Sequence, residues 1–153
     1  MTLIRALIIR EEYINMILSG KKIWEIRKFN TNIRGPIALI SRGYLYGFVH
    51  LKNTFKIDKE TLKRYRDKHG VPPEFIDKYA GDREELYVWV LEKPLRLDKP
   101  LKISYAKGVQ VWAHISLEEI LEKIENSDLK SSVEKMYLRV LLNVGKEGGK
   151  RGI

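Results

Sequence analysis

Cysteine is absent from the 153-residue sequence. The chain therefore has no disulfide bond, no thiol nucleophile and no thiolate ligand for a metal ion. It also lacks any apolar run approaching the roughly 18–20 residues that a membrane-spanning helix needs. The apolar stretch at 3–9 is too short for the core of a signal peptide, and no small-residue cleavage site follows it. We expect an intracellular, cytoplasmic protein without a membrane partner.

Several motifs that identify enzymes and cofactor sites are missing as well. The sequence contains no P-loop, no G-x-G-x-x-G turn for a dinucleotide and no G-x-S-x-G turn for a nucleophilic serine. Its three histidines, His50, His69 and His114, stand too far apart in the sequence to form a helical pair of metal ligands. We therefore expect neither a cofactor nor a bound metal. Glutamine is scarce too, with Gln110 alone, and the abundance of Lys and Glu is typical of thermophilic proteins.

Acidic residues are scarce in the first part of the chain. Residues 1–68 hold 15 Lys and Arg against 6 Asp and Glu, whereas residues 69–153 hold 14 of each kind. The whole net charge of +9 therefore lies in the first part. Between residues 21 and 56 there are eight basic residues and one acid, Glu25. A one-sided excess of this kind favours an anionic partner, of which nucleic acid is the commonest, over a surface that is merely well solvated.

The most informative stretch that is present lies at 20–27 and reads Gly-Lys-Lys-Ile-Trp-Glu-Ile-Arg. Its second half is predicted to be a strand, in which side chains two residues apart share a face. Glu25 and Arg27 are therefore predicted to point one way, and Trp24 and Ile26 the other way. The result is a strand with an apolar back and a charged front.

The spacing of Gly20, Lys22, Glu25 and Arg27 resembles the G-x-K-x-x-E-x-R signature of the ASCH domain, a branch of the PUA-like β-barrels. All four signature positions are filled. The flanking pattern is similar as well: a strand at 3–9, a helix at 13–18, Arg34-Gly35 before a strand at 37–41, and a closing strand that includes 108–112. The resemblance covers residues 3 to 115. It implies an α+β fold, in which a mixed PUA-like β-barrel of five or six strands is flanked by helices.

A two-helix extension is expected after the ASCH-like domain, which we place at 1–115. Ser116-Leu-Glu-Glu119 has the pattern of a capping box that opens the first helix, and a second helix is expected at about 130–144. The extension, 116–144, is expected to pack on the domain, and its helices are the candidate interface for a homodimer. The glycine-rich tail at 145–153 is predicted to be disordered. Within the domain, 56–69 is predicted to be a helix and 48–51 and 86–91 are predicted to be strands.

The resemblance also implies RNA binding, because some ASCH members are similar to RNA-binding modules of translation-linked proteins. Other members are enzymes. One branch hydrolyses an acetylated cytidine through the signature Lys, a nearby Thr and a distant Glu, and another member is a metal-assisted ribonuclease. In this chain the signature Lys is Lys22, but the Thr position falls on Glu25, so the amidohydrolase triad is not reproduced. An acid beside Lys22 also favours its protonated form, which argues against amide hydrolysis.

Our leading hypothesis is RNA binding without a cofactor, through the phosphates and unpaired bases of RNA at a basic cleft. Arg27 and Lys22 are expected to contact phosphate or a base edge, with Glu25 orienting them. Further candidates come from the 30–35 loop and the 41–46 turn, where basic residues lie beside tyrosines that could stack on bases. The full candidate set is Lys21, Lys22, Glu25, Arg27, Arg34, Ser41, Arg42 and Tyr46.

Two other functions stay open. The first is a hydrolase acting on RNA or on a modified nucleoside, of the ribonuclease or acetylcytidine amidohydrolase type, with Lys22 and Glu25 as catalytic residues and Ser41 or Tyr46 assisting. The second is a protein-interaction module that uses the C-terminal helices. For the single residues, structural interpretations compete with functional ones: an Arg27–Glu25 ion pair that only fixes the strand, solvated arginines, and tyrosines that pack in a hairpin. The three tryptophans are expected in the core.

Overall fold

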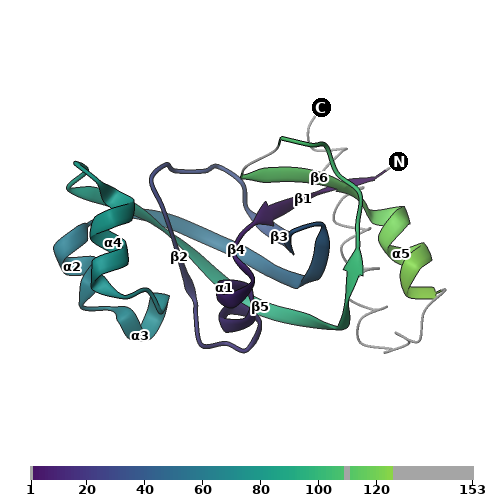
Figure 1. The fold of residues 1–153 in the computed structure, drawn as a ribbon, viewed down its shortest axis with the longest axis horizontal. Coiled ribbons are helices and arrows are strands. Elements are labelled where there is room, and N and C mark those ends of the chain that lie inside the picture. Colours follow the sequence, from purple (N-terminus) through teal and green to yellow (C-terminus); the bar gives the residue numbers. More distant parts are fainter. Residues whose placement is uncertain (1, 109–110, 126–153) are drawn as a thin grey trace.

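The computed structural model describes residues 2–108 and 111–125, which form an α+β fold (Figure 1). In chain order the elements are β1 (Leu3–Ile8), α1 (Glu11–Leu18), β2 (Trp24–Arg27), β3 (Gly35–Ser41), β4 (Tyr44–Asp58), α2 (Lys59–Lys63), α3 (Arg66–His69), α4 (Pro73–Ala80), β5 (Glu85–Lys102), β6 (Trp112–Ser116) and α5 (Leu117–Glu125). The long strands β4 and β5 run along the longest axis, with α2, α3 and α4 gathered at one end and α5 at the other (Figure 1). The second C-terminal helix expected at 130–144 and the tail at 145–153 lie outside the described residues.

One mixed sheet contains all six described strands, in the order β2-β5-β4-β3-β1-β6. β1 and β3 are parallel, and the other neighbours are antiparallel. Within the described residues the edge strands β2 and β6 do not pair with each other, so the sheet is open. The mixed sheet with flanking helices agrees with the prediction, but the predicted closed barrel is not confirmed.

The two edges of the sheet are attached at different places along β4 and β5. β3 pairs with the first half of β4, at 44–51, and continues the sheet towards β1 and β6. β2 pairs instead with 87–90 of β5, which lies opposite 53–56 in the second half of β4. The two edges are therefore attached to opposite halves of one long ribbon, and within the described residues no backbone pairing joins them.

The core has three parts, each formed where helices cover part of the sheet. Ile14 and Ile17 of α1 pack on one face, in a cluster that includes the inner strands β3 and β4. Leu62 of α2 and Ile76 of α4 cover the β2–β5 end. Ile120 of α5 belongs to a third cluster with β1, β3 and β6. Burial of these apolar side chains, at about 25 cal/mol per Å², is the main stabilising term for each helix.

Local sequence explains which helix predictions succeeded. Ser116 opens α5 as predicted, since its Oγ accepts a hydrogen bond from the backbone N–H of Glu119 at 3.1 Å. The single helix expected at 56–69 was wrong. Residues 56–58 continue β4, and Asp58 then caps the short helix α2 by accepting from the N–H of Thr61 at 3.0 Å. Gly70, with φ of 72°, ends α3 in the left-handed conformation.

Candidate functional site

The two faces of β2 carry different chemistry, as the alternation of its side chains predicted. Trp24 and Ile26 belong to the apolar cluster under α2 and α4. Glu25 and Arg27 lie on the opposite face and form an ion pair, in which Arg27 Nη2 is 2.8 Å from Glu25 Oε2. Antiparallel pairing sets Glu25 against Trp89 and Arg27 against Tyr87 on β5, so aromatic rings adjoin the charged face.

Lys22 reaches into the protein instead of towards solvent. The residue is only 1% exposed, and its ammonium donates hydrogen bonds to the carbonyl oxygens of His69 at 2.6 Å and Trp24 at 2.7 Å. Glu25 Oε1 is a third oxygen, 3.5 Å from Nζ. The three N–H groups of an ammonium thus face three oxygen atoms, which lets a charged group stay buried. This side chain joins β2 to the end of α3, 47 residues further along the chain.

Two opposing influences act on the proton of Lys22. Burial is the larger one and lowers the pKa of the ammonium, because a charge is poorly solvated away from water. The carboxylate of Glu25 and its hydrogen bond act in the other direction and raise the pKa of Lys22, while Arg27 lowers it further. The two carbonyl acceptors match the donors of the charged form, so the geometry favours an ammonium that holds β2 in place.

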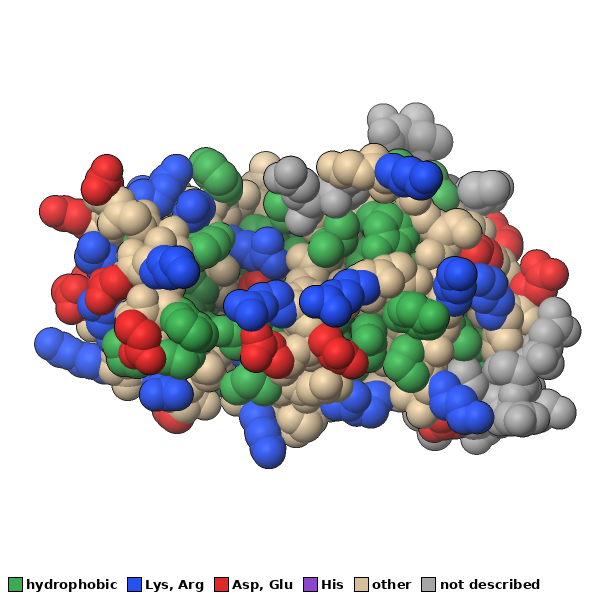
Figure 2. Space-filling model, viewed as in Figure 1, with side chains coloured by type: hydrophobic (Ala, Val, Ile, Leu, Met, Phe, Trp, Pro, Cys, Tyr) green, Lys and Arg blue, Asp and Glu red, His purple; other side chains and the backbone are tan. Residues whose placement is uncertain are grey.

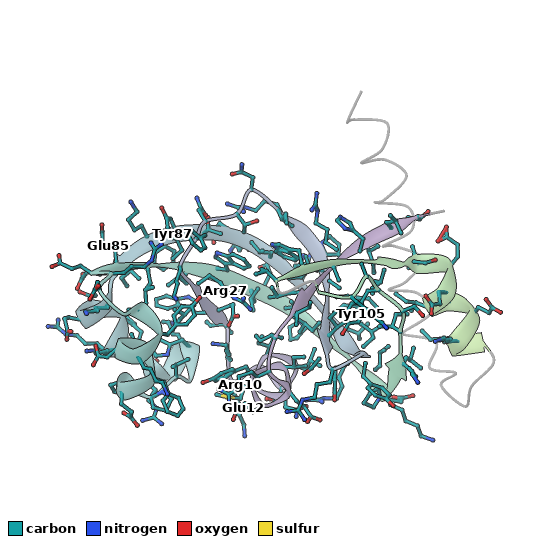
Figure 3. All side chains as sticks on the ribbon, turned by 45° about the horizontal axis from the view of Figure 1, so that its top comes forward. Arg10, Glu12, Arg27, Glu85, Tyr87 and Tyr105 are labelled. Atoms are coloured by element: carbon teal, nitrogen blue, oxygen red, sulfur yellow. The ribbon has the colours of Figure 1, made fainter. Side chains whose placement is uncertain are left out.

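Arg27 is held on two sides and still reaches the surface. Its Nε donates to Glu25 Oε2 at 2.8 Å, and Nη2 donates to the carbonyl oxygen of Ile8 at the end of β1 at 3.3 Å. The guanidinium carbon lies 5.6 Å from the ring centroid of Trp89, within cation–π range. The side chain remains 17% exposed. Figure 3 shows Arg27 on the side of the sheet where Arg10 and Glu12 of the α1 segment project.

Aromatic side chains contact Lys22 and Arg27 or each other beside them, and sequence reasoning assigned none of these rings to the site. The ring of Tyr13 lies 5.1 Å from Lys22 Nζ, and Trp112 stacks on Trp89 with centroids 5.7 Å apart and planes inclined by 10°. We call Tyr13, Lys22, Glu25, Arg27, Trp89 and Trp112 the signature cluster. The tryptophans looked like core residues, and Trp89 is buried, but Tyr13 and Trp112 are only half-buried. Their distant sequence positions gave no signal that they meet beside the charged signature residues.

Tyr79 of α4 lies at the border of the signature cluster. Its hydroxyl accepts a hydrogen bond from the backbone N–H of Lys28 at 3.1 Å. Burial raises the pKa of the Tyr79 phenol, and the nearby positive charge of Arg27 opposes that effect. The pKa of Tyr13 is raised in the same way, first by burial and then by the charge of Glu12. Both phenols are therefore neutral hydrogen-bonding groups at physiological pH.

The other predicted site residues lie in different surroundings. Arg34 is exposed, and its guanidinium donates to the carbonyl oxygens of Thr31 and Ile33, both at 2.8 Å, and to Thr54 Oγ1 at 3.0 Å. These bonds close the loop before β3, and they use three of the five N–H donors of Arg34 within the protein. Lys21 is exposed and follows Gly20 in the turn after α1.

Ser41, Arg42 and Tyr46 belong to the β3–β4 turn. Ser41 is buried at the end of β3, whereas Arg42 is exposed and adopts a left-handed conformation with φ of 51°. The hydroxyl of Tyr46 donates to Glu11 Oε1 at 3.0 Å, which ties the turn to the start of α1. The structure thus brings Lys22, Glu25 and Arg27 together, and it places this second group apart from them at the turn, where Tyr46 is bonded to Glu11.

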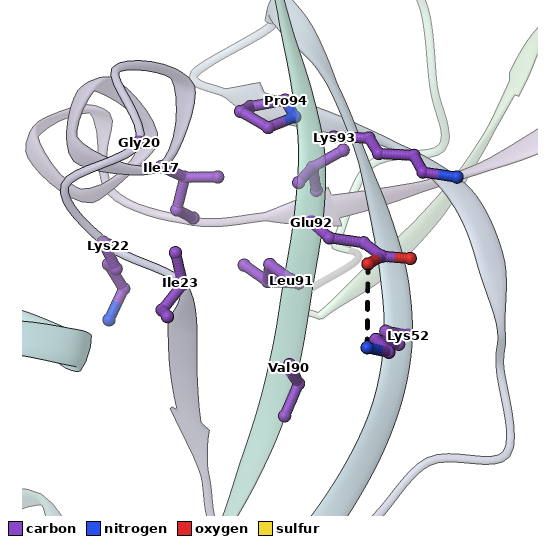
Figure 4. Close-up of a pocket in the computed structure, with 11 residues that line it drawn as sticks. Ile17, Gly20, Lys22, Ile23, Lys52, Val90, Leu91, Glu92, Lys93 and Pro94 are labelled. Atoms are coloured by element: carbon purple, nitrogen blue, oxygen red, sulfur yellow. Dashed lines mark ion pairs between the residues drawn. The ribbon is translucent and has the colours of Figure 1, made fainter.

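A pocket of about 330 Å³ lies on the far side of the Lys22 stem (Figure 4). Its walls are mainly apolar and include Ile17, Ile23 and Leu91. Figure 4 shows the nitrogen of Lys22 directed away from these walls, and an ion pair of 4.0 Å between Lys52 and Glu92 at the rim. The ammonium therefore does not serve this pocket.

Basic and acidic side chains are mixed on one face of the molecule (Figure 2). On the face shown in Figure 2, Lys and Arg side chains are spread along the whole length and acidic side chains stand among them. In residues 2–108 and 111–125, no group of three or more His, Cys, Asp or Glu side chains is placed to hold a metal ion. Over the same residues, no helix combines the length and apolar character needed to span a membrane.

Comparison with known proteins identifies the fold. A family model described as ASCH domain matches residues 7–101. The crystal structure of ASCH from Zymomonas mobilis superposes with a TM-score of 0.67 at 18% sequence identity, covering 79% of this chain and 93% of that chain. Two mutants of that protein, one Ser-to-Ala and one Tyr-to-Phe, give TM-scores of 0.66 at the same identity, covering 79% of this chain and 94% and 96% of theirs. The search of curated proteins gave no match.

Proposed function

This chain belongs to the ASCH domain family, and from that premise we propose that it binds RNA and holds an unpaired base or its phosphate at the signature cluster. Membership carries a general association with RNA. The site within this chain is argued from its own residues, because the structural relatives share too little sequence to transfer a role. The proposal needs a cation that is fixed, accessible and next to aromatic rings, since base stacking and charge act together in RNA recognition.

The fixed and partly exposed guanidinium of Arg27 is the single observation that carries the proposal. Its described hydrogen bonds use Nε and Nη2, which leaves Nη1 for a ligand. Glu25 and the Ile8 carbonyl hold the guanidinium in one orientation, so little conformational entropy is lost when it contacts RNA. Tyr13 and Trp112 supply half-buried rings nearby, against which an unpaired base could pack.

Lys22 has a positioning role in this proposal. The sequence hypothesis placed it in direct contact with RNA, but its ammonium is turned to protein oxygens and is inaccessible. Its electrostatic partner is Glu25, which in turn holds Arg27. Lys22 therefore supports the RNA contact by fixing β2 and the carboxylate that orients Arg27.

Exposed cations around the cluster supply long-range attraction. Lys21, Arg34 and Arg42 lie in the part of the sequence that carries all of the net charge, and each is exposed. Such residues raise the rate of encounter and the affinity for a polyanion without specifying a base, and salt screens their contribution. Ser41 and Tyr46 are assigned a smaller part, because one is buried and the other is bonded to Glu11.

A hydrolase with Lys22 as the catalytic group is the second candidate, and one observation favours it. Burial lowers the pKa of Lys22, which is how a lysine becomes a base or nucleophile. That mechanism also requires a substrate atom within hydrogen-bond reach of Nζ. The present geometry fills that space with the His69 and Trp24 carbonyl oxygens, so RNA binding without turnover is the better-supported function.

Fluorescence anisotropy with an end-labelled single-stranded RNA tests the proposal. The wild-type protein should bind in a salt-sensitive manner, and Arg27→Gln should weaken binding by about tenfold or more, corresponding to about 1.5–3 kcal/mol for one hydrogen bond to a charged group. Arg42→Gln is the matched control, because it removes one exposed arginine at the β3–β4 turn. Equal losses in the two variants would show that only net charge matters. Gel analysis of the RNA after titration separates binding from hydrolysis, since shortened RNA would support the second candidate.

A further inference from the structure

An exposed aromatic surface adjoins the signature cluster at the outer side of β2. Phe29 is 66% exposed and Tyr79 is 38% exposed. Each ring carries a cation on one face: the Arg83 guanidinium carbon lies 4.9 Å from the Phe29 centroid, and Lys28 Nζ lies 4.8 Å from the Tyr79 centroid. Large apolar rings are costly to leave in water, and here both are held in place by a positive group.

A chain of contacts connects this surface to Arg27. The ring nitrogen of Trp89, which lies beneath Arg27, donates to the backbone carbonyl oxygen of Phe29 at 3.2 Å. The backbone N–H of Lys28 donates to the hydroxyl of Tyr79 at 3.1 Å. Phe29 thus lies two residues after Arg27 at the end of β2, and Tyr79 is hydrogen-bonded to Lys28 between them. A strand of nucleic acid leaving Arg27 in this direction would meet them next.

We infer that single-stranded RNA bound at the signature cluster continues across Phe29 and Tyr79, with its bases stacked on these rings and a phosphate near Lys28. This inference rests on the proposed function and specifies its substrate as an unpaired strand longer than one or two nucleotides. Aromatic rings with adjacent cations are the combination by which proteins hold successive unpaired bases. A duplex would not fit this description, because its bases are already stacked on each other.

Acidic residues beside Arg83 in the sequence distinguish it from Lys28 as a contact for RNA phosphate. Asp82 and Glu84 flank Arg83 in the sequence and place negative charge close to it, which weakens any phosphate contact there. Phe29 is uncharged and widely exposed, so stacking is the interaction that the outer end of this surface offers. Lys28, closer to Arg27, is better placed for a phosphate.

Binding of RNAs of two lengths tests the inference. We would measure the affinity of an octanucleotide and of a dinucleotide of matched sequence for the full chain, using wild type, Phe29→Ala and Tyr44→Ala. Tyr44 is the control, because it is similarly exposed, at 42%, but lies at the β3–β4 turn. Phe29→Ala should weaken octanucleotide binding by about tenfold, the usual loss for one stacked base, and change dinucleotide binding by less than twofold. Tyr44→Ala should change neither.

Further variants keep the test decisive. Phe29→Trp and Tyr79→Phe each keep an aromatic ring at their position. Both variants should therefore bind the octanucleotide with an affinity within about twofold of wild type. An octanucleotide affinity unchanged by Phe29→Ala, or equal losses for both lengths, would overturn the inference. If Arg27→Gln still weakens both RNAs in that case, the proposed function survives on its own. If wild type binds neither RNA, both proposals fail.

Discussion

The signature cluster and the β3–β4 turn have similar residues and different architecture. Each region combines arginine with tyrosine in the basic part of the sequence. At the signature cluster, Arg27 is bonded to Glu25 and Ile8 and lies over the ring of Trp89, on which Trp112 stacks. At the turn, Arg42 itself has a left-handed backbone conformation, and the hydroxyl of Tyr46 donates to Glu11. At the signature cluster, a carboxylate, a carbonyl oxygen and an aromatic ring all contact one cation, Arg27. At the β3–β4 turn, the tyrosine has a partner in another element.

The difference shows that composition identifies a basic region but does not identify a site. A guanidinium that is already held by a carboxylate and a carbonyl presents its remaining donors in a defined direction. A free arginine at a turn must be ordered on binding, at a cost of roughly 0.5–1.5 kcal/mol of side-chain entropy. Preorganisation therefore separates the two regions, and each of the following predictions tests part of that separation.

Lys22→Met should produce the largest effect. It keeps the length of the side chain but removes the buried ammonium, so the His69 and Trp24 carbonyl oxygens and part of Glu25 lose their partner. We expect a loss of about 3–5 kcal/mol in the free energy of unfolding, as for other broken buried ion pairs. Chemical denaturation measures it. The neighbouring exposed residue gives the control: Lys21→Met should change the stability by less than about 0.5 kcal/mol. Similar stabilities for the two variants would contradict the structural role of Lys22.

Glu25→Gln should separate positioning from charge. The amide keeps the shape but weakens the ion pair that orients Arg27, while it also raises the net positive charge of the protein. If attraction by net charge governed affinity, RNA binding would become tighter. The account predicts weaker binding, by about 1–2 kcal/mol, because a charge-assisted hydrogen bond to Arg27 is lost. Anisotropy titrations of this variant beside wild type measure the direction of the change.

Acidification should destabilise the protein through His69. The backbone N–H of Val71 donates to its Nδ1 at 2.9 Å and its Nε2 lies 2.7 Å from the Leu62 carbonyl oxygen, a pattern that requires the neutral ring. Burial lowers the pKa of His69 below its ordinary value of about 6.5, so the unfolded chain takes up the proton first. The free energy of unfolding is then fully retained above pH 6.5 and decreases as the pH falls towards the folded pKa, by at most about 1.4 kcal/mol per pH unit for one proton.

Denaturation at several pH values measures this slope. His69→Gln should reduce the slope below pH 6.5. His50 contributes in the same direction, because burial and the charge of Lys93 lower its pKa as well. A slope that is identical in wild type and His69→Gln would show that His69 is not responsible.

Tyr46→Phe should have the smallest effect. It removes a hydrogen bond to Glu11 at the surface, where water replaces the lost partner. The expected change in stability is below about 0.5 kcal/mol, and RNA affinity should change by less than twofold, since the β3–β4 turn lies outside the signature cluster. A thermal melt and one anisotropy titration are sufficient. A large loss of affinity would move the binding site towards the turn.

Much of the fold was predictable from local pattern. The alternation that set Glu25 and Arg27 opposite Trp24 and Ile26 is a property of any strand, and the structure confirms it. The cap at Ser116 was equally local. Whether the sheet closes into a barrel was not predictable in this way, because it depends on where β2 and β3 pair along the long strands β5 and β4. The long strand β4 also hid its second half in a charged segment that resembled a helix.

The site was only half visible in the sequence. The three charged signature residues could be named because their spacing is short, but nothing in the sequence placed Tyr13 beside Lys22, or Trp89 and its stacking partner Trp112 beside Arg27. Nor could the pattern show that Lys22 is sealed beneath the His69 carbonyl, 47 residues away. Long-range contacts decide which member of a charged motif faces a ligand and which one supports the strand.

The most direct test of the central claim uses the ring N–H signals of the three tryptophans in an NMR titration with single-stranded RNA. Trp89 and Trp112 belong to the signature cluster, whereas Trp24 packs against Phe55 and Tyr65 on the opposite face of β2. The account predicts that Trp89 and Trp112 shift progressively while Trp24 stays unchanged, and that Arg27→Gln abolishes the shifts at the same RNA concentrations. Unchanged Trp89 and Trp112 signals under conditions where RNA is bound would contradict it.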